Sequence, residues 1–397
     1  MIAERIEALR AEMQKRKIDM YIVPTSDFHE SEYVGDYFKA RKYITGFTGS
    51  SGTAVITMTE AGLWTDGRYF IQAERELSQS PVTLYRMGEE GVPTIKEYIE
   101  KNLIVGGCLG FDGRVINTKA GSDYEKIATE KQATLYVVED LVDIIWKERP
   151  KFPKNPVFIL EEMYAGECTE SKLKRVREKM REKGASIHIL TSLYDIAWLF
   201  NIRGGDIEHV PVVLSFAVIT MEESIWFLHK EVLDEKLQEY CEKIHIVRKP
   251  YEEIYNYTKA ISEKETVLLD KNIVNYRIFH SLNPNVKVIQ ALNPTEQMKA
   301  IKNKTELSNI CDAHIKDGVA FTKFMYWLKT NIGKKKITEI SASDYLEERR
   351  KEQALFVDLS FDTISAYGAN AAMMHYTATL ESDTELQPKG FLLVDSG

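Results

Sequence analysis

Two residues near the C-terminal end, His375 and Asp395, carry the side chains best suited to chemistry in this sequence. His375 ends an apolar stretch and precedes a tyrosine, while Asp395 closes the apolar run FLLV directly before Ser-Gly. An aspartate at the carboxyl end of such a run is held rigidly and faces whatever lies beyond it. The plainer interpretations, a satisfied histidine near a strand end and a turn aspartate, stay open on these residues alone.

Two other segments place charged residues between apolar runs. In LWTDGRYF the Asp66-Gly67 pair predicts a hairpin turn with Arg68 on its solvated shoulder, because both central residues accept positive φ. The alternative is that Arg68 projects towards a substrate or a partner subunit. In FNIRGGDIEHVPV one loop gathers Arg203, Asp206 and His209, and a lone histidine in such a loop indicates a structural role.

Several familiar catalytic motifs are absent. The sequence has no HExxH, no zinc-finger spacing, no GxSxG and no Walker loop. The run GFTGSSG lacks the GxGxxG order, so it predicts a turn before the following AVITM strand and not a phosphate cradle.

The elements that must position these residues include an internal repeat. Ile6, Leu9 and Met13 form the apolar stripe of a helix, and the strand MYIVP follows it. The stripe returns at Leu173, Val176 and Met180, followed by the strand IHIL, and AVITM occurs at 54–58 and again at 217–221. We therefore expect two related α/β domains.

Breaks in the pattern suggest three domains, at 1–150, 151–297 and 298–397. Three prolines mark the first boundary because they cannot continue a helix or a central strand: Pro150, Pro153 and Pro156. The segment ALNPTEQMKAIKN marks the second boundary. Beyond it, Thr305 predicts the N-cap of a long helix ending near Gly333, and Thr338 caps another helix. Strands are expected in LFVDLSF, around AAMMHY and in FLLVD.

Composition limits the class of protein. The chain has 397 residues, a formal net charge of −8, 44% hydrophobic residues and interspersed charges, which disfavours nucleic acid as a partner. No stretch is long and apolar enough to span a membrane, and the charged N-terminus does not resemble a signal peptide. Four dispersed cysteines suit a reducing compartment, so we expect a cytoplasmic protein.

The whole chain resembles the Xaa-Pro aminopeptidases (aminopeptidase P) of the creatinase/prolidase pita-bread family, in their three-domain form. The segments that carry this resemblance occur in order along the whole sequence: ITGFTGSSGTAVIT, LWTDGRYFIQA, LVDIIWKERP, DIAWLFNIRGGDIEHVPV, AHIKDGVAFTKFMYWL, FVDLSFDTISAYGANAAMMHY and FLLVDSG. The resemblance implies two creatinase N-terminal-like α/β domains followed by the truncated beginning of a pita-bread (α+β) catalytic domain.

The resemblance also implies a site. Members of the family hold two divalent cations, Mn²⁺ or Zn²⁺, and release the residue that precedes a proline in second position. Asp395 matches the first metal-ligand aspartate, and His375 matches the histidine that contacts the substrate. Arg68 stays a weaker candidate for substrate binding. A homodimer is expected, with no nucleic acid and no membrane as partner.

The family's other metal ligands match no residue of this chain, so we expect the gene to continue beyond Gly397. Two dications about 4 Å apart repel by roughly 16 kcal/mol at an effective dielectric constant of about 20, and Asp395 alone cannot offset this repulsion. We therefore expect the 397-residue chain itself to bind no metal pair and to be inactive. Its FLLVD strand is expected to lack a partner within the chain.

Two alternatives to the aminopeptidase stay open. One is a non-catalytic relative that keeps the fold, loses the metal ligands and binds peptides. The other keeps the metal chemistry and changes the substrate, to dipeptides as in prolidase or to creatine. The Asp-Ser-Gly at 395–397 favours an enzyme, and the doubled N-terminal domain favours the aminopeptidase.

Overall fold

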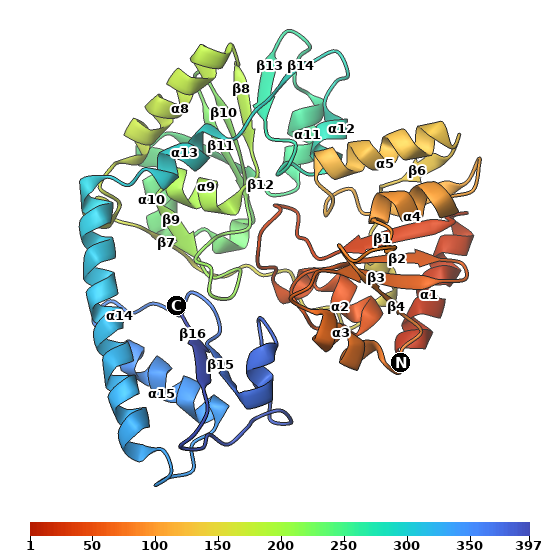
Figure 1. Ribbon diagram of the computed structural model, residues 1–397. Coiled ribbons are helices and arrows are strands. Elements are labelled where there is room, and N and C mark those ends of the chain that lie inside the picture. The colour runs from red at the N-terminus through yellow and green to blue at the C-terminus, as the bar shows by residue number, and fades with distance from the viewer. The chain divides into compact units, whose positions relative to one another are not determined.

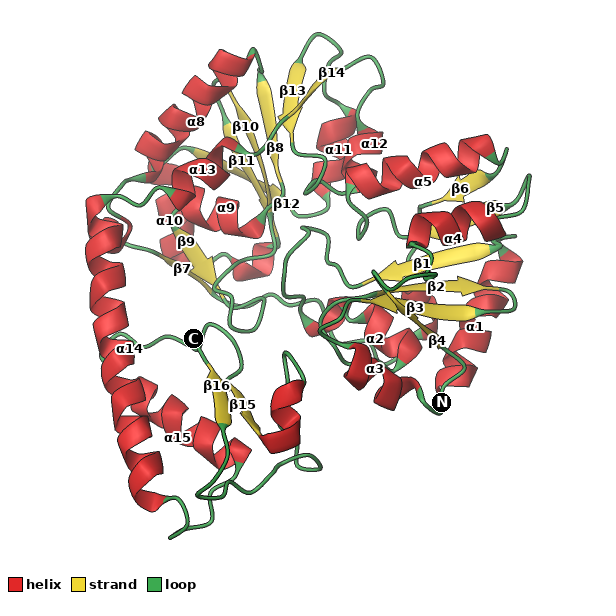
Figure 2. Cartoon of the chain, in the orientation of Figure 1, coloured by secondary structure: helices red, strands yellow, loops and turns green.

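The computed structural model describes residues 1–397, which form two compact units, Met1–Ile301 and Lys302–Gly397 (Figure 1). The first unit contains two six-stranded sheets flanked by helices, and the second contains two helices and a two-stranded sheet (Figure 2). The expected division at 150 and 297 stays a prediction, because both large sheets lie in one compact unit and helix α13 (Pro294–Ala300) spans position 297.

The first sheet has the strand order β4-β3-β2-β1-β5-β6. Its strands are β1 (Met20–Pro24), β2 (Thr53–Thr57), β3 (Ala61–Thr65), β4 (Thr83–Arg86), β5 (Cys108–Phe111) and β6 (Thr134–Tyr136). The accompanying helices are α1 (Ile2–Lys15), α2 (Ala40–Thr45), α3 (Phe70–Leu77), α4 (Ile95–Asn102), α5 (Thr118–Glu130) and α6 (Leu141–Ile145), with a 3-10 turn η1 (Asp36–Phe38). The central strand β1 is antiparallel to β2 and parallel to β5.

The second sheet has the equivalent order β12-β11-β10-β8-β13-β14. Its strands are β8 (Ile187–Leu190), β10 (Phe216–Thr220), β11 (Ser224–Leu228), β12 (Ile246–Pro250), β13 (Thr266–Leu269) and β14 (Lys287–Gln290), and β7 (Val157–Ile159) pairs separately with β9 (Ile202–Gly204). The helices are α7 (Glu162–Ala165), α8 (Thr169–Lys183), α9 (Leu193–Leu199), α10 (Glu235–Lys243), α11 (Glu253–Lys259), α12 (Tyr276–Ser281) and α13, with η2 (Lys230–Val232).

The predicted repeat is confirmed by this equivalence. The stripe of α1 is buried at Ile6, Leu9 and Met13, and the stripe of α8 is buried at Leu173, Val176 and Met180. The two AVITM segments form β2 and β10, which occupy the same place in their sheets, antiparallel to β1 and β8. Local apolar periodicity was sufficient to predict the repeat, because the apolar stripe of each helix packs on its own sheet.

The two sheets of the first unit meet at a junction with reciprocal hydrogen bonds. Each helix N-terminus donates backbone N–H groups to the loop that precedes the other helix. The four bonds are Thr118 N to Val274 O (2.9 Å), Tyr276 N to Ile116 O (2.8 Å), Lys119 N to Lys271 O (2.9 Å) and Arg277 N to Gly113 O (2.9 Å). Asn117 caps α5 and Asn275 caps α12 at the same junction. The repeats therefore face each other through corresponding segments.

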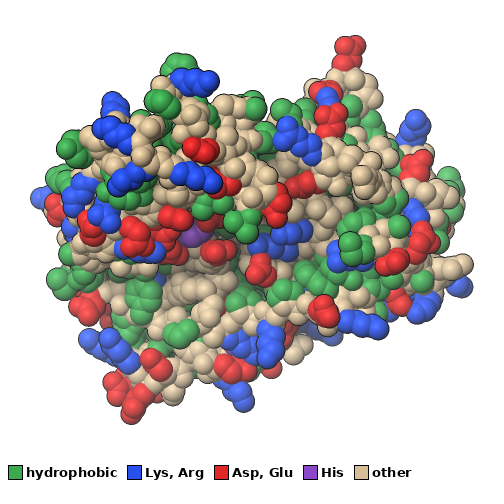
Figure 3. Space-filling model, turned by 90° about the horizontal axis from the view of Figure 1, so that it is seen from below, with side chains coloured by type: hydrophobic (Ala, Val, Ile, Leu, Met, Phe, Trp, Pro, Cys, Tyr) green, Lys and Arg blue, Asp and Glu red, His purple; other side chains and the backbone are tan.

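Figure 3 shows acidic and basic side chains interspersed over one face of the molecule, without a continuous area of one charge. All four cysteines are free thiols. None of the helices combines the length and the apolar character that crossing a membrane would require.

The second unit is built on α14 (Lys304–Asn331) and α15 (Glu339–Lys351), with β15 (Ile364–Tyr367), the 3-10 helix η3 (Gly368–Ala372) and β16 (Leu392–Asp395). Thr338 caps α15 as predicted. The predicted cap of α14 was wrong, because Asn303 accepts from Glu306 N and Glu306 Oε2 accepts from Asn303 N. This capping box starts the helix at Lys304, which places Thr305 inside the first turn.

Two of the three strands expected in this unit are absent. LFVDLSF forms no strand, and Leu355 and Val357 are 71% and 74% exposed. The segment around AAMMHY forms η3 and a turn. FLLVD is a strand as predicted, but it pairs antiparallel with β15 of the same chain, so the expectation that it lacks a partner was wrong. Strand-forming composition alone does not supply a pairing partner.

The expected hairpin at Asp66-Gly67 was also wrong. Strand β3 ends at Thr65, α3 begins at Phe70, and the chain returns as β4, which pairs parallel with β3. Asp66-Gly67 therefore opens a strand-helix-strand crossover. A turn signal followed by YFIQAEREL fits a helix start as well as a hairpin, because the same residues break a strand in both cases.

Candidate functional site

Asp395 is the last residue of β16, directly opposite Ile364 of β15 in the antiparallel register. Its side chain is exposed. No described residue donates a hydrogen bond to its carboxylate or forms an ion pair with it. Two carboxylate oxygens on the end of a paired strand are thus available as hard oxygen ligands for a divalent cation.

His375 lies in the turn that follows η3, and its side chain is exposed. Its backbone φ is +55°, in the left-handed region that residues other than glycine rarely adopt. The next residue, Tyr376, is buried. The chain therefore reverses the direction of its side chains at His375, with the tyrosine directed inward and the imidazole outward.

His375 and Asp395 lie in the same compact unit, on segments that are connected to the β15–β16 sheet. Asp395 ends β16, and His375 follows β15 through η3. No group of three or more His, Cys, Asp or Glu side chains arranged to hold a metal ion occurs among residues 1–397. The donor chemistry of Asp395 fits one ligand of a metal site, and the described residues do not complete that site.

Sequence reasoning missed Glu339, the first residue of α15. Its side chain is completely buried, and it accepts hydrogen bonds from Tyr367 N (2.6 Å), Asn370 Nδ2 (3.1 Å), the Tyr376 hydroxyl (2.9 Å) and Thr384 N (3.1 Å). The only sequence signal was its place after the Thr338 cap, where an acidic residue is common for reasons of helix stability alone.

Arg68 lies in the first unit and is held by a neighbour. Its Nε and Nη2 donate to Asp66 Oδ1 (2.7 Å) and Oδ2 (2.8 Å), and this pairing lowers the pKa of Asp66. The guanidinium side chain is 43% exposed. Its suggested contact with substrate or with a partner subunit stays a prediction.

In the segment FNIRGGDIEHVPV, the aspartate has a structural role. Asp206 is buried and accepts from Asn155 N (2.8 Å) and Leu214 N (2.8 Å), which ties the loop to the linker before β7. Burial raises the pKa of Asp206. His209 has a positive φ of 61° in the same loop.

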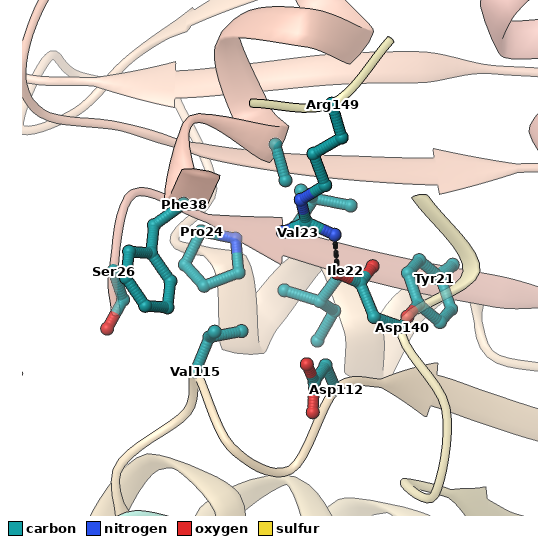
Figure 4. Close-up of a pocket in the computed structure, with 11 residues that line it drawn as sticks. Tyr21, Ile22, Val23, Pro24, Ser26, Phe38, Asp112, Val115, Asp140 and Arg149 are labelled. Atoms are coloured by element: carbon teal, nitrogen blue, oxygen red, sulfur yellow. Dashed lines mark hydrogen bonds and ion pairs between the residues drawn. The ribbon is translucent and has the colours of Figure 1, made fainter. Parts of the chain in front are cut away.

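A small cavity lies at the carboxyl ends of β1 and β5 (Figure 4). Its volume is about 20 Å³, enough for a water molecule but not for a peptide. Arg149 and Asp140 close one side of it, with Arg149 Nη1 donating to Asp140 Oδ2 at 2.5 Å. We interpret this cavity as a packing feature of the scaffold.

Comparisons with known proteins match three stretches of the chain to family models. Residues 5–145 and 148–306 each match the Creatinase/Prolidase N-terminal domain, and residues 308–397 match metallopeptidase family M24. A crystal structure of an X-prolyl aminopeptidase from Caenorhabditis elegans superposes with a TM-score of 0.95 at 31% identity, covering 100% of this chain and 67% of that chain.

The chain belongs to metallopeptidase family M24. Its fold class, two creatinase N-terminal-like α/β domains followed by the start of an M24 catalytic domain, is confirmed. The C. elegans protein is described as a cytosolic enzyme with a di-nuclear active site.

Two curated relatives of this M24 chain are named as aminopeptidases. Probable Xaa-Pro aminopeptidase P from Sordaria macrospora is 36% identical over 410 residues, covering 99% of this chain and 66% of that protein. The protein of the same name from Aspergillus oryzae is 37% identical over 407 residues, covering 100% of this chain and 62% of that protein. The M24 chain thus spans slightly less than two thirds of these relatives.

Proposed function

We propose that this chain belongs to an Xaa-Pro aminopeptidase, which releases the N-terminal residue of peptides with proline in second position. The observation that carries the proposal is the similarity to X-prolyl aminopeptidases along the whole chain, N-terminal repeats included. His375 and Asp395, the two residues predicted to carry the chemistry, both lie in the segment that matches the metallopeptidase family.

Two divalent cations, Mn²⁺ or Zn²⁺, are proposed as cofactors. Asp395 would supply one carboxylate ligand, and its exposed position at the end of β16 with no competing partner supports this role. When bound, such a cation pair supplies an activated water as the nucleophile. Because the 397 residues contain one matching ligand, we expect this polypeptide by itself to bind no metal pair and to hydrolyse no peptide.

His375 is proposed as the side chain that contacts the substrate. Its exposed imidazole can donate a hydrogen bond to a peptide carbonyl, which would orient the bond before proline and favour charge developing on that oxygen. Arg68 stays a weaker candidate for substrate binding. We further propose a cytosolic location and a homodimer, the former because the C. elegans relative is described as cytosolic. Light scattering of the purified protein would test the dimer.

A matched pair of peptides tests the activity. The enzyme is a polypeptide that contains residues 1–397 together with a full set of the family's metal ligands, called here the full-domain protein. The peptides are tripeptides with a free N-terminus that differ only in proline or alanine at the second position. We expect the first residue to be released from the proline peptide alone, and the Asp395→Asn variant to release none.

Other outcomes would contradict the proposal in different ways. Binding without cleavage would indicate a peptide-binding relative. Cleavage of Xaa-Pro dipeptides but not of longer peptides would indicate a prolidase-type dipeptidase. Equal cleavage of the proline and alanine tripeptides would indicate an aminopeptidase without the proposed specificity. Mass spectrometry of the released products distinguishes these results.

A further inference from the structure

Glu339 is an unusual buried carboxylate. It is 0% exposed and forms no ion pair with Lys, Arg or His. A buried charge of this kind is costly unless other groups hydrogen-bond it. Here four neutral donors surround its two oxygens, two of them backbone N–H groups. We infer that the free-energy cost of burying this carboxylate is offset because its hydrogen bonds hold several segments of the chain together.

The four donors come from different parts of one stretch of chain. Tyr367 ends β15, Asn370 lies in η3, Tyr376 follows His375, and Thr384 lies on the return towards β16. Glu339 N also donates to Thr384 O at 3.1 Å, so the start of α15 binds this return in both directions. The carboxylate therefore fixes the path of the segment that carries His375.

The contact with Tyr376 determines where His375 lies. The Tyr376 hydroxyl donates to Glu339 Oε2 and lies 2.8 Å from Ser382 Oγ, which itself accepts from Thr379 N. Burial raises the pKa of Tyr376, so the phenol stays a hydrogen-bond donor at neutral pH. Because His375 is the preceding residue, an anchored Tyr376 leaves its backbone little freedom.

The backbone of His375 shows the same constraint. A φ of +55° at a residue with a side chain persists only where the surrounding structure enforces it. Tyr376 on one side and the β15–η3 connection on the other are both bonded to Glu339, and they supply that enforcement. The end of β15 at Tyr367 pairs with Leu392, the first residue of β16, whereas Asp395 pairs with Ile364 at the start of β15.

We propose that Glu339 is a positioning residue that holds the His375 turn and the β15 end in the geometry required for hydrolysis. The catalytic part of this inference rests on the proposed function, and the structural part does not. Glu339 is bonded to Tyr376, the neighbour of His375, and to Tyr367 at the end of β15, and we expect it to act through these two residues.

Hydrogen–deuterium exchange of the 397-residue chain tests the structural part. Glu339→Gln keeps the size of the side chain but presents an amide group to donors that need an acceptor. We expect faster exchange in peptides covering 364–384, with α14 and the first unit unchanged. Glu385→Gln is the matched control, since Glu385 is exposed and lies beside Thr384. Equal protection in both variants would overturn the proposal.

Steady-state kinetics of the full-domain protein tests the catalytic part. We expect Glu339→Gln to lower kcat by about 100-fold, because small displacements of a positioned group have effects of this size. KM and the metal content per chain should stay within about threefold of the starting protein, and Glu385→Gln should match it. Tyr376→Phe removes one of the four donors, so its kcat should lie between those of Glu339→Gln and Glu385→Gln. This variant serves as the test if Glu339→Gln folds poorly.

The possible failures are distinguishable. If the full-domain protein cleaves no Xaa-Pro peptide, the proposed function is wrong, and hydrogen exchange still decides whether Glu339 organises the segment. If exchange increases at 364–384 while kcat per metal-loaded chain is unchanged in both variants, the positioning role is wrong. A loss of metal content in proportion to the loss of rate would assign Glu339 a purely structural role and would also overturn the proposal.

Discussion

The first unit stabilises its buried carboxylates both with cations and with neutral donors, whereas the buried carboxylate of the second unit has neutral donors alone. In the first unit cations pair with Asp140 (Arg149, 2.5 Å), Asp112 (Arg114, 2.9 Å) and Asp195 (Lys299, 2.8 Å). The buried Asp206 of the same unit instead accepts from two backbone N–H groups. In the second unit the completely buried Glu339 is surrounded by neutral donors. An ion pair joins two side chains, whereas a carboxylate among backbone and side-chain donors fixes several stretches of chain at once.

The segments that these carboxylates hold separate a scaffold from a positioning region. The ion pairs of the first unit lie in the loop after β5, at the linker after α6 and between helices α9 and α13. The hydrogen bonds of Glu339 lie around the segment that carries His375. We therefore expect substitutions in the first unit to change stability and those around Glu339 to change activity.

The largest expected effect on stability is at Arg149. Arg149→Ala would leave the side chain of Asp140, only 10% exposed, without its cation, and uncompensated buried charges of this kind cost about 3–5 kcal/mol. Urea unfolding of the 397-residue chain measures this loss in the free energy of unfolding. Lys96→Ala is the control, because the exposed Lys96–Asp123 pair should contribute below about 1 kcal/mol. Equal losses would remove the distinction between buried and exposed pairs.

The next largest effect is expected at His29, which should make the stability of the first unit depend on pH. His29 is buried, donates from Nδ1 to Thr191 O and accepts at Nε2 from the Tyr251 hydroxyl. Burial lowers its pKa from 6.5 to about 4, so the unfolded chain binds a proton first as the pH falls. Stability from this group is complete above about pH 6.5 and declines towards pH 4, by up to about 3 kcal/mol.

Unfolding experiments between pH 7 and 4 test this dependence. We expect His29→Gln to reduce the slope of unfolding free energy against pH in that window. The exposed His245 is the control, and His245→Asn should leave the slope unchanged, since asparagine accepts the positive φ of 54° at that position. An unchanged slope in the His29 variant would show that other groups cause the acid sensitivity.

A smaller effect is expected at Gly121 in α5. A Cβ at this position would lie 2.1 Å from Cδ2 of Tyr276, which belongs to the second repeat. Gly121→Ala should therefore destabilise the first unit by about 1–3 kcal/mol through overpacking at the junction. Gly318→Ala in α14 is the matched control, because nothing lies within 4 Å of the added Cβ, and it should stabilise by up to about 1 kcal/mol. Thermal unfolding of both variants shows whether each substitution lowers or raises the stability.

Much of the first unit was predictable because its signals are local. The stripes of α1 and α8 and the repeated AVITM strands follow from periodicity within one element. The turn at Asp66-Gly67 was misassigned because the pairing of β3 with β4 depends on residues beyond the turn. The pairing of β15 with β16 is also non-local, so neither the missing strand in LFVDLSF nor the partner of FLLVD could be inferred from composition.

The candidate site was predictable only in part. His375 and Asp395 were found because their types and neighbours match those of a known family. Glu339 could not be found in this way, since its donors Tyr367, Tyr376 and Thr384 are distant in sequence and two of them act through backbone N–H groups. A backbone donor has no residue signature, so such a site is visible only in the folded chain.

We propose that the chemistry resides at the end of β16, with Asp395 as a metal ligand. Native mass spectrometry of the full-domain protein in Mn²⁺ or Zn²⁺ tests this claim most directly. We predict two metal ions per chain for the unaltered protein, and fewer than two for Asp395→Asn at the same metal concentration. Two metal ions in both proteins would contradict the assignment of Asp395.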